Sequence, residues 1–277
     1  MKFLKPLLNF YINSSIHVAF AVFSLSWLTL IQFGLAYDGI VLPFVFFATI
    51  TGYNFVKYYA MAKFHHRNLP VWLKWIQVWS FICFTLVCYY GVQLQGETLC
   101  WIATCGLATF FYAMPFFSKR LATEAQQNLR NVKGLKIYII ALSWVGVTVF
   151  LPLAESHRVI RLDVVLVAVQ RVLFVMVLML PFEIRDLKYD SPKLNTIPQK
   201  LGLKKTKTLG AFLLMIILVL EALRNEVSFN DKGILLVVVL VTFLFLMFSN
   251  KEQNRYYCSL WVESVSILWL VLMVLLS

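Results

Sequence analysis

Three carboxylates stand within eight positions, at Glu183, Asp186 and Asp190, directly after a long run of aliphatic residues. Spacings of three and four place the three side chains on one face if the helix predicted for the aliphatic run continues past the membrane surface. Carboxylates that converge on one face repel each other unless a cation lies between them. Carboxylate oxygens with room for water and phosphate oxygens suit Mg²⁺. The pattern therefore predicts a magnesium site.

Basic residues are interleaved with these carboxylates. Arg185 and Lys188 stand between them, and Lys193 and Lys200 follow. Such side chains suit an anionic ligand that the metal bridges, because guanidinium and ammonium groups form charge-assisted hydrogen bonds with phosphate oxygens. The segment therefore predicts a magnesium-diphosphate site. The alternative is a charged loop that pairs its own aspartates with its own lysines and carries no chemistry.

The elements that must position this segment are apolar helices. Hydrophobic residues make up 61% of the 277 residues, charged residues make up 14%, and the mean hydropathy is +0.78. A helix that crosses ~30 Å of hydrocarbon needs roughly 20 apolar residues, and continuous runs of that length do not fit the short alternating strands of a membrane barrel. We predict an all-α membrane protein, a polytopic bundle that forms one transmembrane domain over residues 1–277. About nine runs are long enough to span, at residues 11–36, 40–60, 72–92, 99–116, 135–154, 160–182, 208–223, 233–249 and 257–276.

The distribution of basic residues predicts the orientation in the membrane. Most of the 25 Lys and Arg residues lie before the first run and in every second connection after it. By the positive-inside rule those connections and the N-terminus are cytoplasmic, and the C-terminus lies on the opposite side. We expect a bacterial inner membrane. A net charge of +12 that is distributed in this way reflects topology and does not indicate nucleic-acid binding.

The order of residues in the carboxylate segment resembles a known family motif. The stretch FEIRDLKYDSPKLNTIPQKLG, residues 182–202, resembles the second aspartate-rich motif of the UbiA superfamily of intramembrane prenyltransferases. That motif reads D-x-x-D-x-x-x-D, followed by T-[LI]-P and L-G, and here Glu183 takes its first position. FYAMPFFSKR, residues 111–120, is similar to the family's Y-S-x-P-x-x-x-K-R segment. Residues 129–144 are similar to the stretch that leads into its fifth span.

The first aspartate-rich motif of the family departs from its pattern in this chain. The family places N-D-x-x-D-x-x-x-D after its second span, and here Asn54 takes the leading position. Phe55, Tyr58 and Ala62 stand where the three carboxylates would be. Neighbouring basic side chains are fixed cations that could bind phosphate directly in place of a metal. These side chains are Lys57, Lys63, Arg67, His65 and His66. The alternative is a segment that has lost its catalytic role.

The resemblance implies an enzyme, a prenyltransferase. In the family an allylic diphosphate loses pyrophosphate, and an electron-rich acceptor captures the carbocation. The implied partners are an isoprenoid diphosphate, a lipophilic acceptor such as an aromatic ring or quinone precursor, and the lipid bilayer. The implied catalytic residues and Mg²⁺ ligands are Glu183, Asp186 and Asp190. The implied substrate-binding residues are Asn54, Lys57, Tyr58, Arg67, Tyr112, Lys119, Arg120, Lys133, Lys136, Arg171 and Lys188.

Arg171 leaves two interpretations open, because a charge in mid-span must face a partner or a wet cavity. It lines the substrate cavity, or it forms a structural pair, for which Glu263 is a candidate. Two other functions also stay open. One is a catalytically inactive relative that keeps the fold and binds isoprenoid lipid. The other is a secondary transporter, in which Arg171 and the carboxylates form the route of a substrate or proton.

Overall fold

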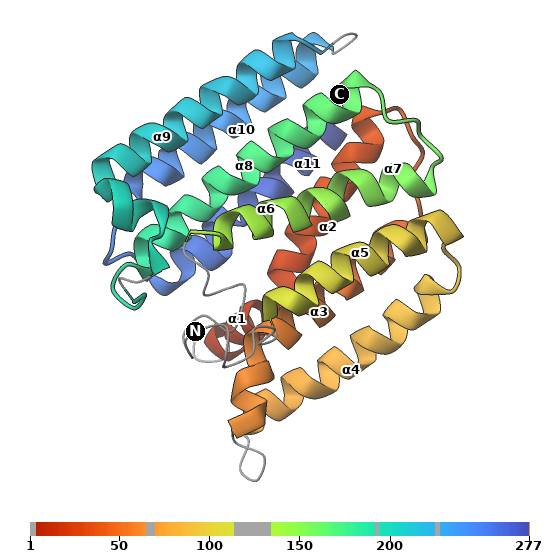
Figure 1. The fold of residues 1–277 in the computed structure, drawn as a ribbon, viewed down its shortest axis with the longest axis vertical. Helices are drawn as coiled ribbons and strands as arrows, with labels where there is room; N and C mark the ends of the chain where they lie inside the picture. Colours follow the sequence, from red (N-terminus) through yellow and green to blue (C-terminus); the bar gives the residue numbers. More distant parts are fainter. Residues whose placement is uncertain (1–3, 65–69, 114–133, 192–193, 225–227, 277) are drawn as a thin grey trace, which may run out of the picture.

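The computed structural model describes residues 4–64, 70–113, 134–191, 194–224 and 228–276, and all regular structure in these ranges is helical. Figure 1 shows the helices as a bundle of long, roughly aligned rods. In chain order they are α1 (Leu4–Asn13), α2 (Ile16–Gln32), α3 (Val41–Phe64), α4 (Val71–Gly91), α5 (Gly96–Ala113), α6 (Lys136–Val145), η3 (Gly146–Phe150), α7 (Leu151–Glu155), α8 (Leu162–Asp186), α9 (Ile197–Ala222), α10 (Phe229–Phe248), η5 (Tyr257–Val262) and α11 (Ser264–Leu276).

Five helical stretches are long and apolar enough to cross a membrane, judged by length and composition. They are α4, the continuous run Lys136–Glu155, α8, α10 and the run Tyr257–Leu276, and the bent pair of α1 and α2 adds a sixth if it counts as one span. The chain is therefore an all-α integral membrane protein, as the composition indicates. The expected number of about nine spans stays a prediction. One long helix outside this set, α9, carries several lysines along its first half.

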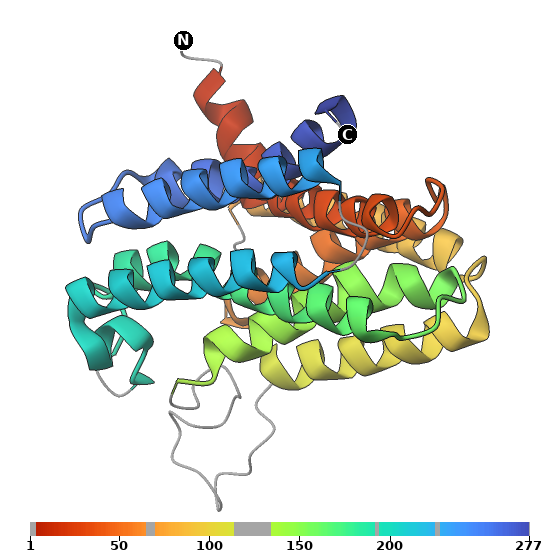
Figure 2. The same cartoon turned by 90° about the horizontal axis from the view of Figure 1, so that it is seen from above.

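The first predicted run, 11–36, is not one straight helix. It is interrupted at Ser14 and Ser15, where α1 and α2 meet at 56°. Ser15 adopts φ 62°, a left-handed conformation that a right-handed helix cannot contain. Figure 2 shows α1 turning away from the rest of the bundle. The short polar sequence Asn13-Ser14-Ser15 is the local cause, because such side chains bond to backbone groups in competition with the helix.

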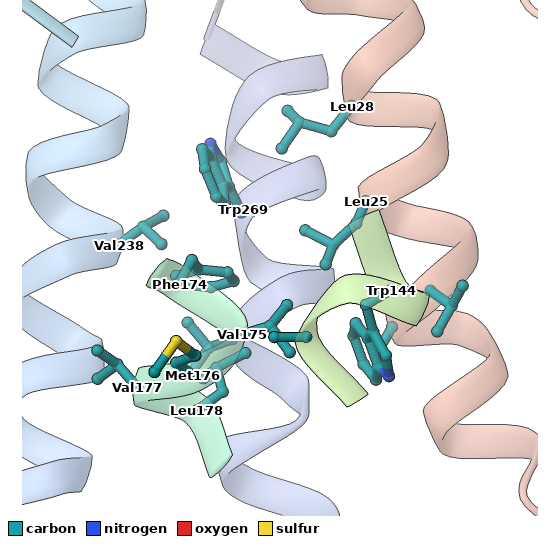
Figure 3. Packing of buried hydrophobic residues seen from close by; sticks show 14 of the residues in the cluster. Leu25, Leu28, Trp144, Phe174, Val175, Met176, Val177, Leu178, Val238 and Trp269 are labelled. Atoms are coloured by element: carbon teal, nitrogen blue, oxygen red, sulfur yellow. The ribbon is translucent and has the colours of Figure 1, made fainter. Parts of the chain in front are cut away.

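The centre of the bundle is built by α2 and α8. The helix α2 contacts α3, α11 and η3, while α8 contacts α6, α9 and α10. Figure 3 shows the apolar side chains that fill the space between them, with Phe174 and Trp269 in contact. The ring centroids of this pair lie 5.1 Å apart in an edge-to-face arrangement, which aromatic quadrupoles favour. Lipid tails are as apolar as these side chains, so dispersion and close packing hold the helices together here.

The helix α9 packs tightly against α8 and α10 at Gly210. A Cβ atom on this glycine would lie 2.3 Å from Leu246 Cδ2 and 2.9 Å from Leu180 Cδ1. Small residues allow such close approach between membrane helices. Gly210→Leu is therefore expected to lower the free energy of unfolding by about 1–3 kcal/mol, the usual cost of overpacking.

Thermal or denaturant unfolding in detergent measures this effect. Gly233→Leu on α10 is the matched control, because nothing lies within 4 Å of the Cβ position there. Equal stability of the two variants would contradict the close α8–α9–α10 packing.

Candidate active site

The carboxylate segment begins at the end of α8. The helix contains Glu183 and ends at Asp186, and the backbone continues through one further turn in which the Asp190 N–H donates to the Asp186 carbonyl at 2.8 Å. The charged neighbours of the Glu183 carboxylate are Lys136, Asp190 and Asp186. The three carboxylates therefore lie near one another, together with a lysine from α6.

Glu183 is buried, with 2% of its surface exposed. Its Oε2 accepts a hydrogen bond of 3.3 Å from the backbone N–H of Ile197, the first residue of α9. The first N–H groups of a helix have no intrahelical acceptor, and this end carries partial positive charge, so a carboxylate is stabilised there. Glu183 therefore joins the end of α8 to the start of α9.

Asp186 lies between two cations. Its carboxylate is 2.9 Å from the Arg185 guanidinium and 3.7 Å from Lys136 Nζ, and about a fifth of its side chain, 21%, is exposed. The start of α6 is held against the carboxylate segment by a hydrogen bond of 2.9 Å from the Gly134 N–H to the Leu194 carbonyl. The pair of Asp186 with Arg185 agrees with the alternative of a loop that pairs its own charges. The contact with Lys136 goes beyond that alternative, because Lys136 belongs to a different helix.

The glycine of the L-G pair has a structural purpose in this segment. Gly202 adopts φ 76° inside α9 and separates the first helical turn, from Ile197, from the long remainder. Glycine reaches this conformation without a steric penalty. The kink lets the start of α9 face Glu183 while the rest of the helix runs alongside α8, which it contacts.

Asn54, the leading residue of the first motif, is buried in a network of structural hydrogen bonds. Its Oδ1 accepts from Ser15 Oγ at 2.7 Å, and its Nδ2 donates to the Ser14 carbonyl at 3.1 Å and to Ser80 Oγ at 2.8 Å. The amide thereby holds the α1–α2 break against α3 and α4. Its predicted contact with substrate stays a prediction.

Replacing Asn54 with leucine should lower the free energy of unfolding by about 1–3 kcal/mol, because buried polar groups at the helix break lose their partners. Thermal unfolding of the purified protein measures the loss. Thr85→Val on α4 is the control, since that exposed threonine bonds only to the carbonyl one turn before it in its own helix. Equal melting temperatures for the two variants would show that the Asn54 network does not stabilise the fold.

Two further side chains proposed from the first motif contact α1. Lys57 Nζ and Tyr58 Oη both donate to the Asn13 carbonyl, at 3.1 and 2.8 Å. Lys57 is in addition a charged neighbour of Glu263, whose other cationic neighbour is Arg185. Glu263 therefore connects the first motif electrostatically with the second. The only sign of this in the sequence is that Glu263 is a single acidic residue in the last apolar run.

Arg171 is buried, with 1% of its surface exposed. Its guanidinium donates to the Leu25 carbonyl at 2.8 Å and to Thr29 Oγ1 at 3.4 Å, and it lies over the Trp269 ring at 5.5 Å. The expected alternative partner, Glu263, lies instead near Lys57 and Arg185. Arg171 thus links α8 to α2.

Lys188 lies on the outer side of the segment. Its Nζ is 3.6 Å from the Glu252 carboxylate, and hydrogen bonding to Tyr189, with the charge of Glu252, raises the pKa of this exposed lysine. Four predicted substrate-binding residues lie outside the described residues, and so does the side chain of a fifth; they are Arg67, Lys119, Arg120, Lys133 and Tyr112.

The donor chemistry of the segment suits Mg²⁺, and the ligand set is incomplete. Among the described residues, no three His, Cys, Asp or Glu side chains form a group that could hold a metal ion. Asp186 is paired with two cations, and Glu183 with a backbone N–H. Mg²⁺ usually binds through one or two carboxylates and completes its shell with water and substrate phosphate. The segment fits this pattern of one or two carboxylate ligands.

Comparison with known proteins identifies the fold. No protein-family model matches the sequence, and no curated protein does. A solved structure of digeranylgeranylglyceryl phosphate synthase matches 98% of this chain and 98% of its own, with a TM-score of 0.57 and 15% sequence identity. The structure of a UbiA homolog from Archaeoglobus fulgidus matches 99% of this chain and 98% of its own, with a TM-score of 0.53 and 10% identity. The protein is therefore a helical membrane protein with a charged cluster where α6, α8 and α9 meet. Its fold is that of the UbiA prenyltransferases, as the motif resemblance implies.

Proposed function

We propose that this protein is a membrane prenyltransferase that binds an isoprenoid diphosphate where α6, α8 and α9 meet. The observation that carries the proposal is the gathering of Lys136, Asp186 and Asp190 around Glu183 in a bundle of the UbiA fold. Carboxylates and cations in one place suit a ligand made of a divalent metal and a diphosphate.

In this proposal, some residues of the chain hold the metal and others stabilise the leaving group. Carboxylates among Glu183, Asp186 and Asp190 would hold Mg²⁺, and the bound ion would supply positive charge against the diphosphate oxygens. Lys136 and Arg185 are cations already in place beside Asp186, and they stabilise the negative charge that grows on the pyrophosphate in the transition state. The bond of Glu183 to the start of α9 fixes the position of that helix end.

The transfer step then follows from the charge on the leaving group. The allylic C–O bond breaks, and its electron pair leaves on the pyrophosphate oxygen. A lipophilic acceptor, an aromatic ring or quinone precursor, forms the new bond with its own electron pair and gives up a proton. The apolar helices around the site keep water from the carbocation.

A second candidate is a catalytically inactive relative that binds isoprenoid lipid. It is favoured by the first motif, where Phe55, Tyr58 and Ala62 replace carboxylates. The hydrogen bonds of Asn54, Lys57 and Tyr58 to the α1–α2 segment also agree with a structural purpose.

Purified protein in nanodiscs, given labelled farnesyl or geranylgeranyl diphosphate, Mg²⁺ and a panel of aromatic and quinone-precursor acceptors, separates the two candidates. Labelled product together with released pyrophosphate supports the enzyme. Saturable binding without turnover supports the inactive relative. The absence of binding contradicts both.

A further inference from the structure

A polar cavity lies at the opposite end of the bundle from the carboxylate segment. Its volume is about 200 Å³, and it is lined where α2 and α9 end and where α8 and α10 begin. Trp269 and Met273, both on α11, contribute to its apolar wall. Figure 1 shows the start of α8, the end of α9 and the C-terminus at this same end of the molecule.

The charged wall of the cavity contains a buried ion pair. Arg224 Nη1 donates to both carboxylate oxygens of Glu221, at 3.2 and 3.0 Å, and both side chains are 7% exposed. Glu221 also accepts a hydrogen bond of 2.8 Å from Gln170 Nε2. This network fixes the guanidinium in place at the cavity wall, so the direction of its remaining N–H groups is set by the fold.

Three polar atoms on this wall are buried and have no hydrogen-bond partner within the described part of the chain. They are the donor Arg224 Nε and the acceptors Gln32 Oε1 and Asp231 Oδ1. Arg224 as a residue is only 9% exposed. A buried polar group without a partner is destabilising, so this wall favours a ligand that both accepts one hydrogen bond and donates others.

The charges of the cavity point to the same kind of ligand. Arg158 and Arg224 are cationic, while Asp163, Glu221 and Asp231 are anionic. A ligand of one sign would be attracted by one set and repelled by the other. The volume is also below the roughly 300–1,000 Å³ of pockets for drug-sized ligands, which favours a molecule the size of a lipid headgroup over an isoprenoid chain.

We propose that this cavity binds a small zwitterion, an aminoethyl phosphate group, with the phosphate accepting from Arg224 Nε and Arg158. The ammonium group donates to Gln32 Oε1 and Asp231 Oδ1. Such a group occurs as the headgroup of phosphatidylethanolamine and as free ethanolamine phosphate, and the cavity's position at the helix ends is open to either source. The inference is independent of the prenyl-transfer proposal, because the two sites lie at opposite ends of the bundle.

The first test uses soluble probes on purified protein in detergent. Ethanolamine phosphate is expected to raise the melting temperature. It should bind about tenfold more weakly to Asp231→Asn, where a charge-assisted hydrogen bond becomes a neutral one, and to Gln32→Leu, where one acceptor is lost. Glu97→Gln, an exposed carboxylate at the start of α5, is the control and should bind as the wild type does. Inorganic phosphate alone and ethanolamine alone should each bind more weakly than the zwitterion, and equal binding of either one would overturn the proposal.

The second test distinguishes the two sources. Protein purified from membranes that contain phosphatidylethanolamine is analysed for bound lipid by native mass spectrometry, for the wild type and for Asp231→Asn. Lipid retained by the wild type and lost from the variant supports a headgroup site, while binding of the soluble probe alone supports a site for the free molecule. If neither lipid nor soluble probe binds, the cavity holds only water and the proposal is wrong.

Discussion

Asp186→Asn is expected to lower the rate of prenyl transfer by about 10²–10³-fold, the usual result of removing one preplaced electrostatic group from an active site. The substitution keeps the size of the side chain and removes its charge. Asp186 then no longer attracts a divalent cation, and Lys136 and Arg185 lose the carboxylate that positions them. The measurement is the initial rate with labelled isoprenoid diphosphate, with donor and Mg²⁺ at saturating concentration.

Folding must be separated from chemistry in this experiment. A partly exposed ion pair contributes about 0–1 kcal/mol to stability, so the melting temperature of Asp186→Asn should stay close to that of the wild type. Glu252→Gln is the control, because this exposed carboxylate also pairs with a basic residue of the segment, Lys188. A folded Asp186→Asn protein with an unchanged rate would show that Asp186 does not hold a catalytic metal.

Glu221→Leu is expected to lower the free energy of unfolding by about 3–5 kcal/mol, the cost of leaving one partner of a buried ion pair without the other. Arg224 would keep its charge in a buried site, and Gln170 would lose the acceptor of a 2.8 Å hydrogen bond. Denaturant unfolding in mixed micelles measures the change.

The double variant Glu221→Leu with Arg224→Leu provides the comparison. It should be more stable than Glu221→Leu alone, because replacing both members of a buried pair by apolar residues is often nearly neutral. A double variant that is less stable than Glu221→Leu alone would show that the two charges do not stabilise each other.

The sequence indicates that the three carboxylates are close along the chain, but it does not indicate their partners. Glu183, Asp186 and Asp190 lie near one another because all three belong to one short chain segment, although α8 ends at Asp186 and Asp190 lies in the turn that follows. The bond of Glu183 to the start of α9 depends on the kink at Gly202 and on how two helices pack. Tertiary contacts of this kind leave no periodic pattern in the sequence.

Asn54 illustrates the same difference at the first motif. Its position in the motif predicts a contact with substrate, whereas its hydrogen bonds in the structure go to Ser14, Ser15 and Ser80. The apolar run 11–36 indicates a membrane helix but does not indicate that Ser15 turns left-handed. The polar triplet at Asn13 is the one local signal for that break.

Arg171 shows why a charge within a span is hard to interpret from sequence. Its depth predicts a buried partner or a wet cavity, and in the structure its guanidinium contacts buried groups. The partner is the backbone and a hydroxyl of α2, with the face of Trp269 beside it. Backbone carbonyls occur at every position, so sequence alone cannot single out Leu25 as the acceptor.

Binding of labelled geranylgeranyl diphosphate to the protein in nanodiscs, with and without Mg²⁺, tests most directly the claim that the segment from Glu183 to Asp190 holds a metal and a diphosphate. The account predicts saturable binding that strengthens with Mg²⁺, is displaced by inorganic pyrophosphate and weakens in Asp186→Asn. Binding that is independent of Mg²⁺, resists pyrophosphate and is unchanged in Asp186→Asn would contradict it.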